Sequence, residues 1–224
     1  MTIKENIELI ENDIKKYSKD GANLLCVTKT HGIDTIKTVY DLGYRDFGEN
    51  KVQELLEKKQ ELPKDIRWHL IGHLQRNKVK KIIGEVFLIH SVDSFRLLEE
   101  IDKVASKKNL IQDILIQVNI SKEDTKGGFY IEELENLFKN IEQFRNVRVL
   151  GLMTIAPNIE DEQYISSVFR ELKKIFDKLS KLSYNNIDMK YISMGMTNDY
   201  ILALKEGSNI IRIGSKIFGK RVYK

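Results

Sequence analysis

The chain opens on a polar stretch in which apolar residues recur every three or four positions. Ile3, Ile7, Ile10 and Ile14 carry this spacing, which predicts an amphipathic helix over residues 2–18. Beyond this helix the pattern changes, and short apolar runs alternate with longer stretches of helical periodicity. The apolar runs predict strands at 24–28, 44–48, 67–72, 86–92, 113–120, 147–153, 189–194 and 209–214. The stretches between them predict helices at 33–42, 50–61, 75–83, 94–106, 131–142, 160–182 and 198–206.

Strands that alternate with helices predict βαβ units and a parallel sheet. Eight such units after one extra helix favour a closed barrel over an open doubly wound sheet, and 224 residues fit the ~200 to over 400 typical of that barrel. Pro63 and Pro157 both fall between segments, and no linker or internal repeat interrupts the chain. We therefore predict an α/β fold, a single-domain (β/α)₈ TIM barrel over residues 1–224 with an extra N-terminal helix.

Composition and charge exclude several classes of protein. With 42% hydrophobic residues the chain can bury a core, and its net charge of +4 indicates no particular partner. The lone cysteine, Cys26, lies in an apolar run and is expected to be a small core residue. No signal peptide and no apolar run of about 18 residues is present, so we expect a cytoplasmic protein without a membrane partner. The lysine-rich stretch 77–83 suggests nucleic-acid binding as a further alternative. Nearby acidic residues and the lack of aromatic residues favour a solvated helix face instead.

Two basic residues stand in strands that otherwise look built for burial. Lys29 ends the run "LLCVTKT", and Arg212 lies between Ile211 and Ile213 in the last strand. With period-two alternation the two isoleucines face the outer helices, and Lys29 and Arg212 turn toward the barrel mouth, where barrel active sites lie. The alternatives are a solvent-exposed strand end for Lys29 and a buried structural ion pair for Arg212.

Two segments near the end of the chain could bind phosphate. Residues 193–199 and 212–219 combine glycine with serine or threonine directly before a helix start, after the seventh and eighth strands, where barrels bind phosphate. Each segment could instead be a plain helix cap. A lysine, an arginine and a phosphate cradle are the parts that a pyridoxal phosphate site needs. The amine condenses with the aldehyde as a Schiff base, and the arginine donates to the pyridine nitrogen.

Several motifs resemble one known family. "VTKT", "DFGENKVQE", "WHLIGHLQRNK", "VNIS", "KGGF", "GLMTI", "SMGMTND" and "RIGSKIFG" look like those of the pyridoxal phosphate homeostasis proteins, the YggS/PROSC group. These proteins are similar to the barrel domain of alanine racemase. The resemblance extends from about residue 5 to 221, with the motifs in the expected order.

The resemblance implies that Lys29 carries pyridoxal 5'-phosphate as an internal aldimine and that Arg212 faces the pyridine nitrogen. The residues that it places along the phosphate are Ser193, Met194, Gly195, Thr197, Gly214 and Ser215. Asn50 and His73 would line the pocket. Thr28, Thr197 and Ser215 differ from the commonest family residues but keep a hydroxyl. Lys216 stands where a small residue is usual, and the sequence gives no role for it.

A carrier and an enzyme are both compatible with such a site. Racemisation needs an acid or base on each face of the substrate, and alanine racemases take the second from a tyrosine of an additional β domain. We expect that domain to be absent here because the chain ends at Lys224. An arginine at the pyridine nitrogen also weakens the ring as an electron sink. The expectation is a monomeric pyridoxal phosphate carrier in vitamin B6 homeostasis, with pyridoxal-phosphate-requiring apoenzymes as partners. A pyridoxal-phosphate-dependent amino-acid racemase or related enzyme is the alternative.

Overall fold

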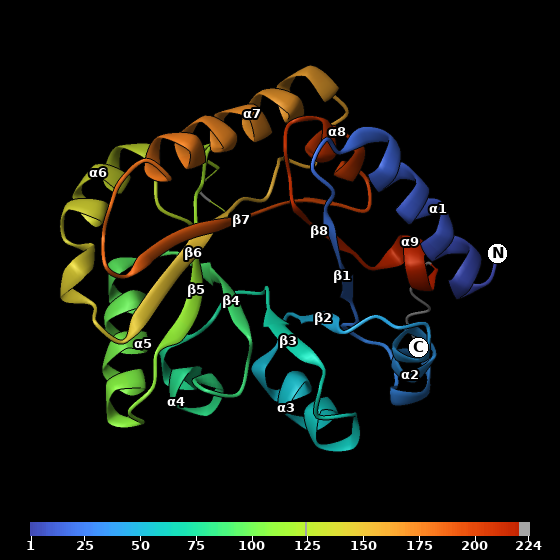
Figure 1. Cartoon of the computed structure of the whole chain (residues 1–224), viewed down its shortest axis with the longest axis horizontal. Helices are drawn as coiled ribbons and strands as arrows, with labels where there is room; N and C mark the ends of the chain where they lie inside the picture. Colours follow the sequence, from blue (N-terminus) through green and yellow to red (C-terminus); the bar gives the residue numbers. More distant parts are fainter. Residues whose placement is uncertain (124, 220–224) are drawn as a thin grey trace.

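Eight parallel strands close into a barrel in sequence order (Figure 1). The computed structural model describes residues 1–123 and 125–219. The strands are β1 (Asn23–Val27), β2 (Asp46–Glu49), β3 (Arg67–Leu70), β4 (Leu88–Val92), β5 (Gln112–Gln117), β6 (Val147–Met153), β7 (Ile187–Met196) and β8 (Ile210–Ile213). Hydrogen bonds between β1 and β8 close the barrel, with Leu25 opposite Arg212. The predicted (β/α)₈ barrel with an extra N-terminal helix is confirmed.

Helices cover the outside of this barrel and follow the predicted order. They are α1 (Ile3–Tyr17), α2 (Ile33–Asp41), α3 (Val52–Glu61), α4 (Val79–Ile82), α5 (Phe95–Lys107), α6 (Ile131–Lys139), α7 (Glu162–Leu179), α8 (Tyr200–Lys205) and α9 (Ser215–Phe218). Two 3₁₀ turns, η1 (Arg76–Lys78) and η2 (Ile141–Gln143), extend α4 and α6. The predicted helix over 75–83 is therefore a 3₁₀ turn followed by one α-helical turn. The sequence indicated a helix start within 212–219 but gave no range for the short α9.

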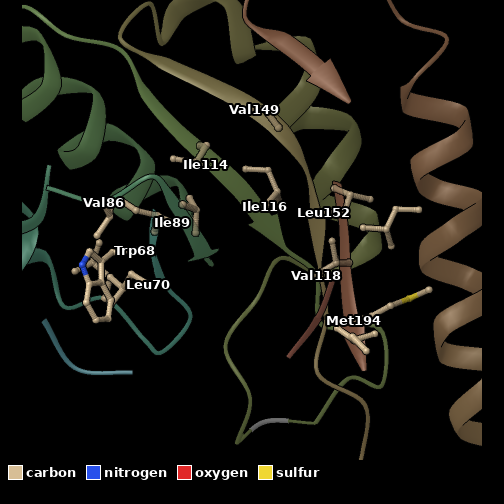
Figure 2. Packing of buried hydrophobic residues seen from close by; sticks show 14 of the residues in the cluster. Trp68, Leu70, Val86, Ile89, Ile114, Ile116, Val118, Val149, Leu152 and Met194 are labelled. Carbon is tan, nitrogen blue, oxygen red and sulfur yellow. The ribbon is translucent and has the colours of Figure 1, made fainter. Parts of the chain in front are cut away.

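The strands are apolar on both faces because each face is buried against a different layer. Figure 2 shows the outer layer between strands and helices, with Trp68, Ile114 and Leu152 among its members. The inner layer fills the barrel with Leu88, Leu115, Leu150 and Met153. Parallel strands covered on both sides read as near-continuous hydrophobic runs, which is the pattern of the sequence. Cys26 is fully buried in the outer layer, as expected, and burial raises the pKa of its thiol.

The N-terminal helix α1 packs against α8 and α9 of its own barrel. Ile7, Ile10 and Ile14 are buried there, as predicted, and a capping box between Thr2 and Glu5 fixes the start of the helix.

Polar contacts join α1 to the last two helices. Nδ2 of Asn6 donates to the carbonyl oxygen of Ile217 at 2.9 Å, and the Tyr200 hydroxyl donates to Asp13. The ammonium group of Lys216 lies 4.9 Å from the centre of the Tyr200 ring and 3.9 Å from Asp13. Lys216, for which the sequence indicated no role, therefore ties α9 to α1 and α8.

Among the described residues, no helix combines the length and the apolar composition that crossing a membrane requires.

Candidate functional site

A cavity of about 370 Å³ lies at the carboxyl ends of the strands, and we call it the barrel-mouth cavity. Six of the residues singled out in the sequence line it together: Lys29, Asn50, Thr197, Arg212, Gly214 and Ser215. They come from the ends of β1, β2, β7 and β8, so positions far apart in the chain meet because the barrel closes. This is the end of the fold at which barrel proteins place their active sites.

Lys29 reaches this cavity because the residue before it is held outside the barrel. The Thr28 hydroxyl donates to Oε1 of Glu49 at 2.6 Å, and Nζ of Lys58 donates to the Thr28 carbonyl oxygen at 2.8 Å. Thr30, with φ of +70°, donates its backbone N–H to Oε1 of Glu54 at 2.7 Å. The backbone on both sides of Lys29 is thus fixed, and its half-buried side chain lines the cavity.

Lys58 is the second lysine near the end of β1, and its surroundings differ. Its ammonium group is buried between Glu49 at 2.6 Å and Glu54 at 2.7 Å, and it is not among the residues that line the cavity. Desolvation by burial raises the pKa of Glu49, against the pull of the Lys58 charge. Lys58 therefore supports the loop that carries Lys29.

Arg212 points into the barrel, as the alternation of β8 predicted, and is only 4% exposed. Its Nη1 donates to the Ser193 hydroxyl at 2.8 Å, and its Nη2 donates to the Thr154 carbonyl oxygen at 2.9 Å. No carboxylate of the described residues lies within ion-pair distance, so the structure does not show the ion pair considered from the sequence. Burial lowers the pKa of the guanidinium to about 10, opposed by the charge of Asp199. Arg212 is thus a cation at neutral pH with donors at the floor of the cavity.

Thr197 and Ser215 form the hydroxyl-rich side of the cavity. The Ser215 hydroxyl donates to Oγ1 of Thr197 at 3.2 Å, which joins the β7 and β8 ends. Helices α8 and α9 are short, and neither begins with a side-chain capping bond. Asp199 and Gly214 are the N-cap residues of these helices, so both segments do cap a helix, but without a side-chain hydrogen bond. What they offer an anion is hydroxyl groups and backbone N–H groups beside Gly214.

Three predicted residues lie behind the cavity wall rather than on it. Ser193 is fully buried and contacts Arg212, whereas the Met194 side chain lies in the outer hydrophobic layer (Figure 2). Gly195 has φ of +89°, and a Cβ atom there would lie 2.6 Å from the Cβ of Ala203. Gly195 therefore lets α8 approach β7 closely. His73 is also away from the cavity, with an exposed side chain whose Nδ1 lies 2.9 Å from Asp93.

Sequence reasoning missed part of the wall. Ile155, Asn158 and Ile159, from the connection between β6 and α7, line the cavity. Asn198 and Asp199 also line it; they belong to the segment 193–199 that the sequence indicated, but they were not assigned individually. The signal that was available is their place directly after predicted strands. A strand end shows which loop lies at the barrel mouth but not which of its side chains turns inward.

Comparison with known proteins agrees with this arrangement. The model of the family "Alanine racemase, N-terminal domain" matches residues 2–222. The pyridoxal phosphate homeostasis protein of Aquifex aeolicus is 45% identical over 203 residues, which cover 90% of this chain and 88% of that protein. That of Schizosaccharomyces pombe is 35% identical, over 98% of this chain and 93% of that protein.

Solved structures of similar proteins have the same barrel fold. PipY of Synechococcus elongatus with PLP bound superposes with a TM-score of 0.86 at 31% identity, over 97% of this chain and 100% of that chain. Alanine racemase of Bartonella henselae shares the fold, with a TM-score of 0.71 at 15% identity, and is covered over 60% of its length. The chain belongs to the pyridoxal phosphate homeostasis protein family, whose barrel is that of the alanine racemase N-terminal domain.

Proposed function

We propose that this protein binds pyridoxal 5'-phosphate in the barrel-mouth cavity, as a Schiff base on Lys29, and acts in intracellular pyridoxal phosphate homeostasis. The observation that carries the proposal is the meeting of Lys29 and Arg212, from the first and last strands, on one cavity with hydroxyl groups beside them. Membership of a family named for this role, with PipY solved with PLP bound, supports it.

The residues present fit the three parts of the ligand. The cavity volume of about 370 Å³ lies within the ~300–1,000 Å³ common for small-ligand pockets. Thr197, Ser215 and the backbone near Gly214 offer hydrogen bonds to a phosphate, and Arg212 offers N–H donors to a ring nitrogen. The Lys29 amine is placed to add to the aldehyde carbon, with loss of water and formation of a C=N bond.

The chain's own groups favour holding the ligand over broad catalysis. When bound, pyridoxal phosphate supplies an aldehyde that traps amines and a ring that accepts electron density. Arg212, which remains charged, opposes protonation of the ring nitrogen and so weakens that electron sink. Among the described residues that line the cavity, the ionisable ones are Lys29, Asp199 and Arg212. Asp199 accepts a hydrogen bond from the Met196 backbone, and burial raises its pKa, so Lys29 and Asp199 are the lining groups that can move a proton.

A racemase or related enzyme is the second candidate, because its fold is shared. Two-base racemisation needs a second proton-transfer group opposite Lys29, and the described cavity lining supplies for it only Asp199, whose Oδ1 is engaged by the Met196 backbone N–H. The lengths of the similar proteins also favour a carrier over a racemase. PipY is covered over its entire chain, whereas alanine racemase extends well beyond the shared barrel. We further propose a cytoplasmic monomer that exchanges pyridoxal phosphate with apoenzymes that require it.

Titration of the purified protein with pyridoxal phosphate, followed by absorbance, tests the proposal. The wild type should develop the visible band of a Schiff base, and Lys29→Ala should not. Free amino acids should give turnover far below ~1 per second, the lower end of ordinary enzymatic rates. Steady racemisation at or above that rate would support the enzyme instead, and a wild-type protein without the band would contradict binding.

A further inference from the structure

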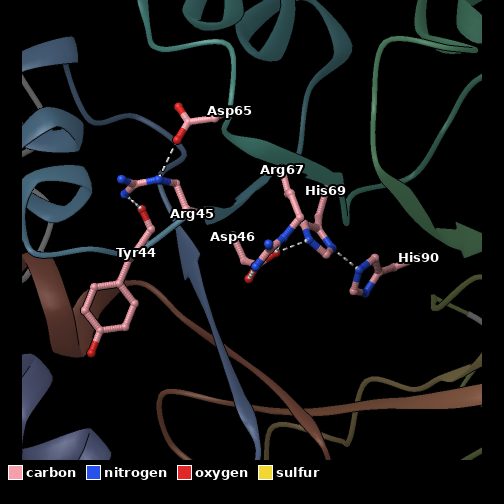
Figure 3. Close-up of polar contacts among 7 residues, drawn as sticks. All are labelled: Tyr44, Arg45, Asp46, Asp65, Arg67, His69 and His90. Atoms are coloured by element: carbon pink, nitrogen blue, oxygen red, sulfur yellow. Dashed lines mark hydrogen bonds and ion pairs between the residues drawn. The ribbon is translucent and has the colours of Figure 1, made fainter.

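A row of polar side chains crosses the barrel interior beneath Arg212, and the proposed function leaves it unexplained. The Ser193 hydroxyl lies 2.9 Å from Nδ1 of His90, and Nε2 of His90 lies 2.9 Å from Nδ1 of His69. Nε2 of His69 lies 3.1 Å from Oδ1 of Asp46. Figure 3 shows the last part of this row, with His90, His69 and Asp46 in line. We call Ser193, His90 and His69 the interior array.

The two ends of the array fix the direction of every hydrogen bond within it. Arg212 can only donate, so Ser193 accepts from it and has its own proton left to donate to Nδ1 of His90. His90 must then carry its proton on Nε2 and donate to Nδ1 of His69. His69 in turn donates from Nε2 to the Asp46 carboxylate, which can only accept.

The opposite direction does not satisfy these contacts. It would require Nδ1–H on both histidines, and the unprotonated Nε2 of His69 would then face the Asp46 carboxylate without a proton between them. A doubly protonated His69 would repair that contact. However, desolvation lowers the pKa of His69, against the effect of Asp46, and lowers the pKa of His90 further. Both histidines are therefore neutral Nε2–H tautomers.

Charge explains why such an array is needed. Arg212 is 4% exposed and lacks a carboxylate within ion-pair distance among the described residues, and an isolated buried charge is costly. Asp46 lies at the amino-terminal end of the barrel, where Arg67 donates to it from Nε at 2.7 Å. Hydrogen bonds that all run in the same direction polarise one another. The chain of hydrogen bonds from Arg212 to Asp46 therefore couples the buried positive charge to this negative charge.

We propose that Ser193, His90 and His69 are positioning residues that orient Arg212 and link its charge to Asp46 at the opposite end of the barrel. Because the Ser193 proton is directed to His90, the hydroxyl always presents an acceptor to Arg212. The guanidinium is thereby held at the cavity floor. Its effect on a bound pyridine ring rests on the proposed function, whereas the array itself does not.

Nitrogen-15 NMR of the ligand-free protein at neutral pH tests the array without the cofactor. Two-bond nitrogen–proton correlations distinguish the two neutral tautomers from the imidazolium form. His69 and His90, assigned by comparison with single His→Asn variants, should both be Nε2–H tautomers. A Nδ1–H tautomer or an imidazolium at either residue would overturn the proposal.

Ser193→Ala tests the action on Arg212, and Ser91→Ala is the matched control. Ser91 is a buried serine whose hydroxyl donates to the Gly72 carbonyl oxygen, outside the array. Loss of a hydrogen bond to a charged group is expected to weaken pyridoxal phosphate binding about tenfold or more in Ser193→Ala. The absorption maximum of the bound ligand should also shift, with neither change in the control.

Wild-type binding and an unchanged spectrum in Ser193→Ala would refute the positioning role while leaving the proposed function intact. If wild type itself fails to bind, the proposed function fails, and the NMR result still decides the array.

Discussion

At the scale of single residues, the structure separates two lysines that lie close together but do different work. Strand alternation turns Lys29 to the barrel mouth, as the sequence predicted. Lys58 lies in the outer layer between two glutamates, and nothing in the sequence distinguished it from its neighbour Lys59, which is only half-buried. Lys58 lies on α3 and its partner Glu49 on β2, so only the folded chain shows that Lys58 is buried.

Lys58→Met should destabilise the fold without moving the ligand. Removing one partner leaves the Glu49 carboxylate buried without its cation, which typically costs about 3–5 kcal/mol. Lys59→Met is the control, since Lys59 pairs with Glu85 near the surface and should cost less than about 1 kcal/mol. Denaturant unfolding of both variants measures the difference, and equal losses would contradict the support role of Lys58.

At the scale of elements, hydrophobic periodicity was enough to predict eight strands and their order. The ends of elements were less predictable. β7 begins and ends two residues outside its predicted range of 189–194, and α9 is too short to show periodicity. The site residues also differed in how well the sequence placed them. Alternation placed Lys29 and Arg212. Met194 and Gly195 were assigned to the phosphate by resemblance, and the structure shows that they also serve the packing of β7 and α8.

Gly195→Ala tests that packing, with Gly43→Ala as the control. Both glycines have positive φ, +89° and +97°, so both variants bear the backbone strain of an alanine in that region. At Gly43 nothing lies within 4 Å of the new Cβ, whereas at Gly195 it meets Ala203 at 2.6 Å. Gly195→Ala should therefore lose about 1–3 kcal/mol more stability than Gly43→Ala, from overpacking. Similar losses in urea unfolding would show that close approach of α8 is unimportant.

At the scale of the whole molecule, the barrel interior joins groups that the sequence could not connect. Asp46, His69, His90, Ser193 and Arg212 come from five different strands, and their contacts depend on register around a closed sheet. Period-two alternation predicts which residues face inward. It does not predict which of them meet at hydrogen-bond distance.

The buried histidines should make the stability of the whole fold depend on pH. Their folded pKa values lie below the ordinary 6.5, so the unfolded chain binds protons first as pH falls. Stability is then full above about pH 6.5 and declines below it, by up to ~1.4 kcal/mol per pH unit for each histidine. Urea midpoints between pH 7.5 and 5 measure this slope. The slope should be shallower in His90→Asn than in the wild type. A wild-type slope of zero would contradict the prediction.

The chain should also sediment as a monomer near 26.1 kDa at micromolar concentration. The isoleucine stripe of α1 is buried on its own barrel, and exposed apolar side chains such as Leu9, Leu42 and Ile111 lie on separate elements. Single apolar residues on separate elements do not supply the contiguous patch that a stable dimer buries. A dimer whose mass is independent of concentration would contradict this and point to a site shared between subunits.

The most direct test of the central claim is to trap the ligand and locate it. The protein is incubated with pyridoxal phosphate, reduced with borohydride, digested and examined by mass spectrometry. The reduced adduct should lie on Lys29 and disappear in Lys29→Ala, while Lys58→Met, if folded, keeps it. An adduct that remains at one other lysine in Lys29→Ala would show that the barrel-mouth cavity is not the binding site.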